Sequence, residues 1–332
     1  MTSRRDAIAA GAAAVFGPMA FGQAASVRRI GYLGYTAATP PGDERIWLAF
    51  VQRLRELGFV EGANLTIESR YAEGHNERYV ELAAELVRLR SEVIVVSNGS
   101  AARAVMGASR NTAIVTIAVP DPVRAGLVAS LARPGGRVTG ISNLSEDLVP
   151  KRIELLKMAV PGARRIAFAR CPRCAQTAGE SQAQVAALLG EHVATARTLG
   201  ATLQPLDVND VADFDAACAA ALREHADALL IGATQINVAL RDQWLAFAAA
   251  HKLPMLAPYR SFGALLSYGP DIAALYRHAA DFVARILNGA DPAEIPMEQP
   301  TTFELVVNLR IARSIGLTIS QSLLLRADEV IQ

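Results

Sequence analysis

Short apolar runs alternate with amphipathic stretches along most of the chain, and this alternation constrains the fold more than any other feature. The run at 29–35 (RIGYLGY) is followed by apolar side chains at helical spacing from Trp47 to Leu57, where Gly58 ends the pattern. Strands that alternate with helices of this length predict parallel sheets with helices on both faces. Further strand-like runs follow at 65–71, 93–96, 113–119, 138–141, 165–169, 203–208, 228–231 and 254–257.

The predicted strands are more than one sheet domain usually holds. A chain of 332 residues with 52% hydrophobic side chains can bury two cores. The alternation is interrupted at the polar segment 143–147 (NLSED) and again at 267–271 (SYGPD). We therefore predict an α/β protein with two doubly wound parallel-sheet lobes, in which a ligand binds beyond the carboxyl ends of the strands.

The first 25 residues have the composition of an export signal. Arg4 and Arg5 precede a weakly hydrophobic segment at 8–21, and Ala24-Ala25 supplies small residues for cleavage. The apolar segment is shorter than the roughly 20 residues that span a bilayer, which argues against a permanent membrane anchor. We predict a twin-arginine-like signal peptide at 1–25, cleaved near residue 25, and a mature protein in the periplasm.

The motifs of several common enzyme classes are missing from the sequence. None of the three lysines follows the glycine of a phosphate-binding loop, and there is no G-x-S-x-G, H-E-x-x-H or G-x-G-x-x-G. The five histidines are scattered singly, and the net charge of +1 gives no basic surplus for nucleic acid. We therefore expect a protein that is not an enzyme, with no cofactor, no metal and no nucleic-acid partner.

Two cysteines at C-x-x-C spacing, Cys171 and Cys174, follow the predicted strand at 165–169. Export favours disulfides, and the third cysteine, Cys218, then stays free or pairs elsewhere. A thiol-disulfide oxidoreductase of thioredoxin type also places C-x-x-C between a strand and a helix, but here Pro172 follows the first cysteine and no aromatic residue flanks the pair. The sequence leaves four interpretations of the pair open: a tight disulfide, a redox centre, a metal site that needs two further ligands, or a polarisable wall of a pocket.

Seven segments, in their order and spacing, resemble the ABC-transporter substrate-binding protein family that includes tryptophan- and tyrosine-binding members. The resemblance covers nearly the whole mature chain. It implies the type I periplasmic-binding-protein fold, in which two lobes joined by three hinge strands close over a small ligand. The segments are 29–34 (RIGYLG), 54–62 (LRELGFVEG), 82–89 (LAAELVRL), 121–136 (DPVRAGLVASLARPGG), 139–142 (TGIS), 267–271 (SYGPD) and 298–308 (EQPTTFELVVN).

The resemblance also implies a function and a division into lobes. Residues 27–142 plus 268–292 would form the N-terminal lobe, and 143–267 plus 297–332 the C-terminal lobe. The protein would capture an amino acid or another small carboxylate in the periplasm and deliver it to the permease subunits of an ABC importer, without chemistry. Ligand-sensing regulators share this fold, but they carry a DNA-binding helix-turn-helix where the export signal stands here.

Side chains that follow the predicted strands are the candidate ligand contacts. A zwitterionic ligand needs hydroxyls and helix-terminal N–H groups for its carboxylate, and acidic groups or carbonyls for its ammonium. Ser100 and the amides near it suit a carboxylate and Asp121 suits an ammonium, although both residues, like Asn98, equally suit helix caps. The ten candidates are Tyr35, Thr36, Asn98, Gly99, Ser100, Asp121, Cys171, Gln235, Asn237 and Tyr259.

Cys171 has a particular place among these candidates. In relatives of the family an Asn-Pro pair commonly follows this strand and faces the cleft, whereas Cys171-Pro172 stands here. Pocket lining is therefore the interpretation of Cys171 that we favour over catalysis. We expect the ligand of this protein to differ from that of its relatives at this position.

Overall fold

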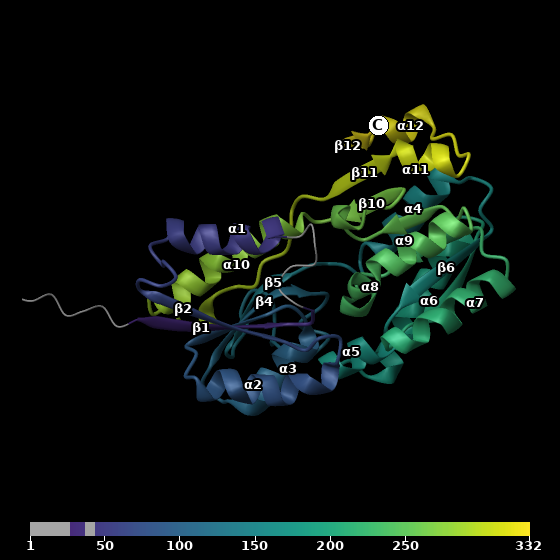
Figure 1. Ribbon diagram of the computed structural model, residues 1–332. Coiled ribbons are helices and arrows are strands. Elements are labelled where there is room, and N and C mark those ends of the chain that lie inside the picture. The colour runs from purple at the N-terminus through teal and green to yellow at the C-terminus, as the bar shows by residue number, and fades with distance from the viewer. Residues whose placement is uncertain (1–26, 37–43) are drawn as a thin grey trace, which may run out of the picture.

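The computed structural model describes residues 27–36 and 44–332, so the predicted export signal lies outside the described residues. The chain forms two α/β lobes, each built on its own sheet (Figure 1). The first sheet has five parallel strands in the order β2-β1-β3-β4-β5. They are β1 (Arg28–Gly34), β2 (Leu65–Tyr71), β3 (Val93–Val96), β4 (Ala113–Val119) and β5 (Val138–Ser142).

Helices cover both faces of the first sheet because its strands are apolar on both faces. In β1, Ile30 and Tyr32 lie in one core and Leu33 lies in the core on the opposite face. Helices α1 (Glu44–Glu56) and α10 (Ile272–Leu287) pack together over the first of these cores, and α2 (Tyr79–Arg88) and α3 (Gly99–Ala108) over the second.

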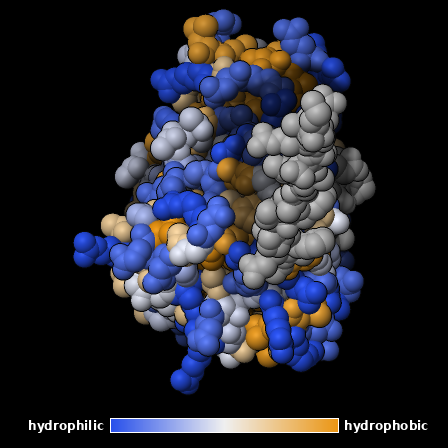
Figure 2. Space-filling view, turned by 90° about the vertical axis from the view of Figure 1, so that its left-hand side faces the viewer, coloured by the Kyte–Doolittle hydropathy of each residue, from blue (hydrophilic) through white to orange (hydrophobic). Residues whose placement is uncertain are grey.

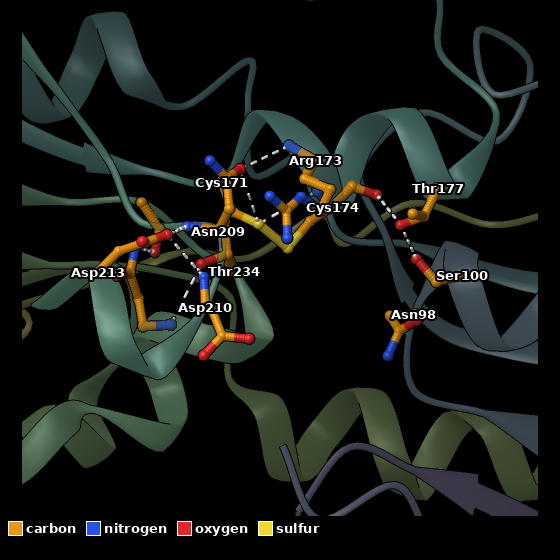
Figure 3. Close-up of a disulfide and its surroundings, with 12 residues drawn as sticks. Asn98, Ser100, Cys171, Arg173, Cys174, Thr177, Asn209, Asp210, Asp213 and Thr234 are labelled. Atoms are coloured by element: carbon orange, nitrogen blue, oxygen red, sulfur yellow. Dashed lines mark hydrogen bonds between the residues drawn. A yellow bond between two sulfur atoms is a disulfide. The ribbon is translucent and has the colours of Figure 1, made fainter. Parts of the chain in front are cut away.

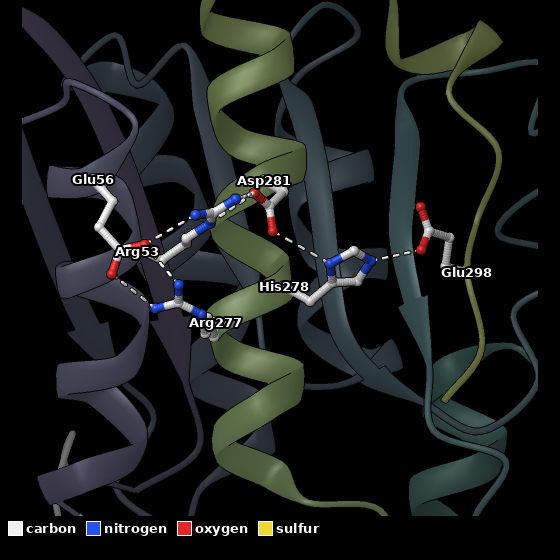
Figure 4. Close-up of polar contacts among 6 residues, drawn as sticks. All are labelled: Arg53, Glu56, Arg277, His278, Asp281 and Glu298. Atoms are coloured by element: carbon white, nitrogen blue, oxygen red, sulfur yellow. Dashed lines mark hydrogen bonds and ion pairs between the residues drawn. The ribbon is translucent and has the colours of Figure 1, made fainter. Parts of the chain in front are cut away.

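Ion pairs join α10, which is distant in sequence, to α1 (Figure 4). Arg53 Nη2 lies 2.8 Å from Asp281 Oδ1, and Arg277 Nη2 lies 2.6 Å from Glu56 Oε2. The two arginines lower the pKa of Glu56 to about 2. These contacts hold α10 on the N-terminal lobe, although the chain has passed through the other lobe before reaching it.

The second sheet has seven strands in the order β12-β11-β10-β9-β8-β6-β7. All its pairs are parallel except β10 with β11, which run antiparallel. The hydrophobic pattern predicted neither β10 nor the two strands that follow it. The strands are β6 (Arg165–Arg170), β7 (Thr202–Asp207), β8 (Ala228–Ile231), β9 (Met255–Ala257), β10 (Leu266–Gly269), β11 (Glu304–Asn308) and β12 (Glu329–Ile331).

The second sheet also has helices on both faces (Figure 1). The described part of the chain, in both lobes, also contains the short 3-10 helices η1 (Asn76–Arg78), η2 (Val211–Asp213), η3 (Arg260–Phe262) and η4 (Pro292–Glu294). The α-helices of the C-terminal lobe are α4 (Val149–Ala159), α5 (Pro172–Ala178), α6 (Gln182–Thr198), α7 (Phe214–Arg223), α8 (Gln235–Ala239), α9 (Arg241–Ala250), α11 (Leu309–Ser314) and α12 (Gln321–Leu324).

Three segments of the chain cross between the lobes. The first follows β5, the second joins β10 to α10, and the third precedes β11. The third segment runs beside β5, since the Ser142 N–H donates to the Glu298 carbonyl at 2.9 Å. Tyr268 and Gly269, which the resemblance assigned to the N-terminal lobe, pair with β11 in the second sheet, so the chain re-enters the first lobe after Gly269.

Arg152 joins two of these crossings from inside the second lobe. Its side chain is fully buried, its Nε donates to the Tyr268 carbonyl at 2.8 Å and its Nη1 donates to the Ser145 carbonyl at 2.9 Å. Burial lowers the pKa of Arg152 to about 10, so the guanidinium remains charged at neutral pH. A buried cation therefore fixes where the first and second crossings enter the C-terminal lobe.

A membrane span requires a helix of sufficient length and apolar character. No helix in the described part of the chain combines the length and the apolar character needed to cross a bilayer. The coloured part of the face drawn in Figure 2 carries mostly hydrophilic side chains, with groups of apolar ones between them.

Candidate ligand-binding site

A cavity of about 80 Å³ lies between the two lobes. Its N-terminal wall comes from the loops after β3 and β4, and its C-terminal wall from the loops after β6 and β8 together with α5. These loops lie at the carboxyl ends of parallel strands, where the divergence of neighbouring crossovers leaves room for a ligand. Both lobes contribute polar side chains, so a molecule held here would contact both.

Six of the ten candidates from the sequence line this cavity: Asn98, Gly99, Ser100, Asp121, Cys171 and Gln235. The other four, Tyr35, Thr36, Asn237 and Tyr259, do not line it as the described residues define it. Tyr35 is 2% exposed and its hydroxyl donates to the Gly74 carbonyl at 2.6 Å. Its ring is therefore part of the core of the N-terminal lobe.

Asn237 and Tyr259 follow strands as predicted, but their side chains turn into the protein. The Asn237 amide donates to the carbonyls of Ala169 and Gly232 at 3.1 Å each and accepts from Trp244 Nε1 at 3.2 Å. The Tyr259 hydroxyl accepts a hydrogen bond from Asn143 Nδ2 at 3.2 Å. Because these bonds occupy their polar atoms, both side chains brace the protein instead of facing the cavity.

The N-terminal wall is built around the start of α3. Asn98 caps this helix, since its Oδ1 accepts from the Ala101 N–H at 2.9 Å, and its Nδ2 lies 2.7 Å from the Tyr79 hydroxyl. Gly99 and Ser100 occupy the first turn, where a helix leaves its N–H groups without helical partners and has a positive potential. This end of α3 therefore suits the carboxylate of a ligand.

Asp121, after β4, accepts from the N–H groups of a turn and is also part of the wall. Its Oδ1 accepts from the backbone N–H groups of Val123 at 3.1 Å and of Arg124 at 2.8 Å. Arg124 Nη1 lies 3.9 Å from the other carboxylate oxygen. Residues 122–126 form turns and no helix, so the predicted helix cap is wrong: Asp121 closes a turn, and its side chain contributes a carboxylate to the cavity surface.

Cys171 and Cys174 form a disulfide at the start of α5 (Figure 3). The Cys174 N–H donates to Cys171 Sγ at 3.1 Å, so Cys171 also caps the helix. Both cysteines line the cavity, and Cys171 is 5% exposed. Cys218 is a free and buried thiol on α7, and burial raises its pKa to about 12.

Several polar contacts join the two lobes around the cavity. Ser100 Oγ of α3 lies 2.6 Å from Thr177 Oγ1 of α5 (Figure 3). Arg124 Nε donates to Glu180 Oε2 at 2.9 Å, and Gln235 Nε2 donates to the Ser97 carbonyl at 3.2 Å. Because each pair has one partner in each lobe, the structure is that of a closed state.

Comparison with known proteins identifies the family. Residues 40–331 match the profile of the family described as ABC transporter substrate binding protein. The chain belongs to this family. The resemblance read from the sequence is thereby confirmed, and since family members are solute-binding proteins, so is the prediction that this one is not an enzyme.

Similar proteins agree with this assignment. A tyrosine-binding protein of Clostridioides difficile (strain R20291) is 25% identical over 272 residues, which are 81% of this chain and 75% of the relative. The crystal structure of a conserved domain protein from Vibrio cholerae O1 biovar eltor str. N16961 is 26% identical, with a TM-score of 0.82 over 92% of this chain and 100% of that one.

The fold is also that of an ABC domain from Streptococcus pneumoniae in complex with L-Trp. That structure is 23% identical and has a TM-score of 0.81, covering 92% of this chain and 100% of its own. The predicted two-lobed α/β architecture of the type I periplasmic-binding-protein fold is thus confirmed for this substrate-binding protein.

Two acidic residues at the cavity of this substrate-binding protein were missed in the sequence. Glu146 belongs to the polar segment after β5, which we interpreted only as a break between lobes, and Glu180 lies between α5 and α6. Burial raises the pKa of both carboxyl groups, and nearby arginines oppose the shift. Neither residue directly follows a predicted strand, so the rule that selected the ten candidates passed over both.

His192 lies beside the disulfide and should make the stability of this substrate-binding protein depend on pH. It is 3% exposed, it lines a second cavity beside Cys171, and burial lowers its pKa to about 4. The unfolded chain binds the proton near pH 6.5, so the free energy of unfolding should fall by about 3 kcal/mol as the pH drops from 6.5 towards 4.

Urea unfolding at pH 7 and pH 4.5 measures this contribution. We expect His192→Gln to have a smaller loss of unfolding free energy between the two pH values than the wild type has. His251→Gln, which changes an exposed histidine, should keep the wild-type loss. Equal pH dependence in His192→Gln and the wild type would show that His192 is not responsible.

Proposed function

We propose that this protein is the periplasmic solute-binding component of an ABC importer, which captures an amino acid or a similar small carboxylate and delivers it to a membrane permease. The observation that carries the proposal is the cavity between two lobes, lined by polar and apolar side chains at the carboxyl ends of their strands, with lobe-to-lobe contacts around it. The export signal at 1–25 would bring the protein to the compartment from which such an importer takes its substrate.

The N-terminal lobe would hold the carboxylate of the ligand. The N–H groups of Gly99 and Ser100 stand at the positive end of α3, a ten-residue helix, which is a favourable place for an anion. The carboxylate of Asp121 would accept from the ligand's ammonium. An amino acid combines these two groups, and the names of two similar proteins, a tyrosine-binding protein and a complex with L-Trp, support this class of ligand.

Ligand binding would drive closure because the ligand contacts both lobes only when they have closed. The Ser100–Thr177 and Arg124–Glu180 contacts form in the same state and add to its stability. A ligand shifts such an equilibrium only by its preference for one state. The permease would then be able to distinguish the loaded protein from the empty one by the arrangement of the lobes.

A thermal-shift screen tests the proposed function. The mature chain would be unfolded and refolded to remove any carried ligand, and then heated with each amino acid and with small carboxylates. A ligand present at 100 times its dissociation constant should stabilise the folded state by about 2.7 kcal/mol, which raises the melting temperature measurably. If no amino acid or carboxylate raises the melting temperature, the proposed function is wrong.

Ser100→Ala should weaken the binding of the amino acid found in this screen by about tenfold, because one hydrogen bond across the lobes is lost. Thr198→Ala is the matched control, since its exposed hydroxyl bonds only within α6, to the Thr195 carbonyl. Titration calorimetry gives both affinities. An affinity of Ser100→Ala equal to that of the control would remove Ser100 from the site.

A further inference from the structure

We propose that the ligand is an aliphatic amino acid with a second, cationic nitrogen on its side chain, such as a diamino acid. This inference rests on the proposed function and concerns the charge of the same ligand. It is based on the side chains that form the cavity wall and on the hydrogen bonds that those side chains already make.

The wall is acidic and lacks aromatic rings. It includes the carboxylates of Asp121, Glu146 and Glu180, and no lysine, arginine, histidine or aromatic side chain among the residues that the structure describes. The segment 37–43, outside those residues, has the sequence AATPPGD and also contains none of these types. The apolar part of the wall consists largely of small side chains: Ala118, Ala125, Ala175, Ala178 and Ala233.

Arg124 pairs with two of these three carboxylates. Arg124 Nε donates to Glu180 Oε2 at 2.9 Å, and its Nη1 lies 3.9 Å from Asp121. Glu180 is 8% exposed, and its other oxygen, Oε1, has no hydrogen-bond partner among the described residues. One guanidinium thus lies between two carboxylates, and its Nη2 is buried without a hydrogen-bond partner among the described residues.

Glu146 carries the third negative charge. Its carboxylate has neither a hydrogen bond nor an ion pair within the described part of the chain, although it lines both the main cavity and the second cavity behind the disulfide. Arg152, Arg124 and Arg170 attract Glu146 through space, but none of them donates a hydrogen bond to it, and Arg152 donates to the carbonyls of Tyr268 and Ser145. A carboxylate at a partly buried wall without a donor is costly, and a cationic ligand group would supply the donor.

The positions of these groups fit a ligand that spans the cleft. The start of α3 lies on the N-terminal lobe and suits the carboxylate, whereas Glu146 and Glu180 belong to the C-terminal lobe. A linear side chain with a terminal amine or guanidine would pass between the alanines to reach them. The cavity of about 80 Å³ offers no aromatic face to stack on, so an aromatic ligand has less to contact here than a cationic one.

Titration calorimetry with L-lysine and L-norleucine tests the charge of the ligand. The two amino acids have the same carbon chain, and norleucine lacks the terminal amine. L-Ornithine, L-arginine and L-tryptophan complete the set of probes. We expect at least one cationic amino acid to bind about 30-fold more tightly than norleucine and tryptophan, which corresponds to about 2 kcal/mol and lies within the range for a charge-assisted hydrogen bond.

Glu146→Gln assigns the effect to one residue. It should lower the affinity for the cationic amino acid by about 10-fold or more and leave the affinity for norleucine unchanged. Glu154→Gln, which changes an exposed carboxylate of α4 that pairs with Lys151, is the control and should change neither. Glu146→Asp keeps the charge on a shorter side chain and should retain part of the preference, which separates the loss of charge from a general loss of structure.

The outcomes separate this inference from the proposed function. Tighter binding of tryptophan or norleucine than of every cationic amino acid would overturn the inference and leave amino-acid capture standing. An unchanged affinity of Glu146→Gln for the cationic ligand would also overturn the assignment to Glu146. If no amino acid binds to the wild type, the proposed function fails as well.

Discussion

Gly99→Val should reduce amino-acid affinity by at least about 100-fold, because the lobes would be unable to reach the closed state. A Cβ at Gly99 would lie 2.6 Å from the Ala178 Cβ on the opposite lobe, closer than two such atoms approach. A loss of this size corresponds to about 2.7 kcal/mol. Titration calorimetry with the amino acid that gives the largest thermal shift measures it.

Gly107→Val is the matched control for this prediction. Gly107 lies on the same helix, and a Cβ there would have no atom within 4 Å, so its variant should bind as the wild type does. The double variant Gly99→Ala with Ala178→Gly should bind more tightly than Gly99→Ala alone, because the second change removes the colliding atom. Wild-type affinity in Gly99→Val would show that the closed state does not need this approach of α3 to α5.

Arg152→Met should lower the free energy of unfolding by about 3–5 kcal/mol. The side chain is fully buried, and its removal leaves the carbonyls of Ser145 and Tyr268 without donors and the charge of Glu146 without its nearest counter-charge. Urea unfolding followed by circular dichroism gives the value. Since Arg152 fixes two crossings, we expect this loss to exceed that of any other single change considered above.

Lys151→Met, at the neighbouring position on α4, is the control for Arg152→Met. Its ammonium is partly exposed and pairs only with Glu154, so the expected loss is within about 1 kcal/mol. Adding Glu146→Gln to Arg152→Met should restore part of the lost stability, because the uncompensated carboxylate disappears. Equal losses in the two single variants would contradict the structural role of Arg152.

The strong hydrophobic patterns of the sequence predict most of the fold. The runs at 93–96 and 113–119 are apolar on both faces, as expected for strands between two layers of helices. In the structure both runs form inner strands of the first sheet. β10 (LSYG) and β12 (EVI) are as short as β3 and β9, but each contains a polar residue and neither forms an apolar run, and β12 is only partly buried. Their positions depend on pairing with strands distant in sequence, which a local pattern does not contain.

The candidate site was predictable to the extent that polar residues follow strands. This rule brought Ser100, Asp121 and Gln235 to the cavity. It failed for Asn237, which also follows a strand, because the carbonyls of Ala169 and Gly232 take up its amide. A polar loop side chain turns into the protein when buried backbone C=O or N–H groups beside it need a hydrogen-bond partner. Only the folded structure shows which backbone groups those are.

Small-angle X-ray scattering of the mature protein, freed of ligand and then saturated with the amino acid that binds it, tests the central claim most directly. If the two lobes close over an amino acid, the radius of gyration should be smaller in the saturated protein than in the free one, and Gly99→Val should not show the decrease. An unchanged radius of gyration in the wild type at full saturation would contradict capture by closure of the lobes.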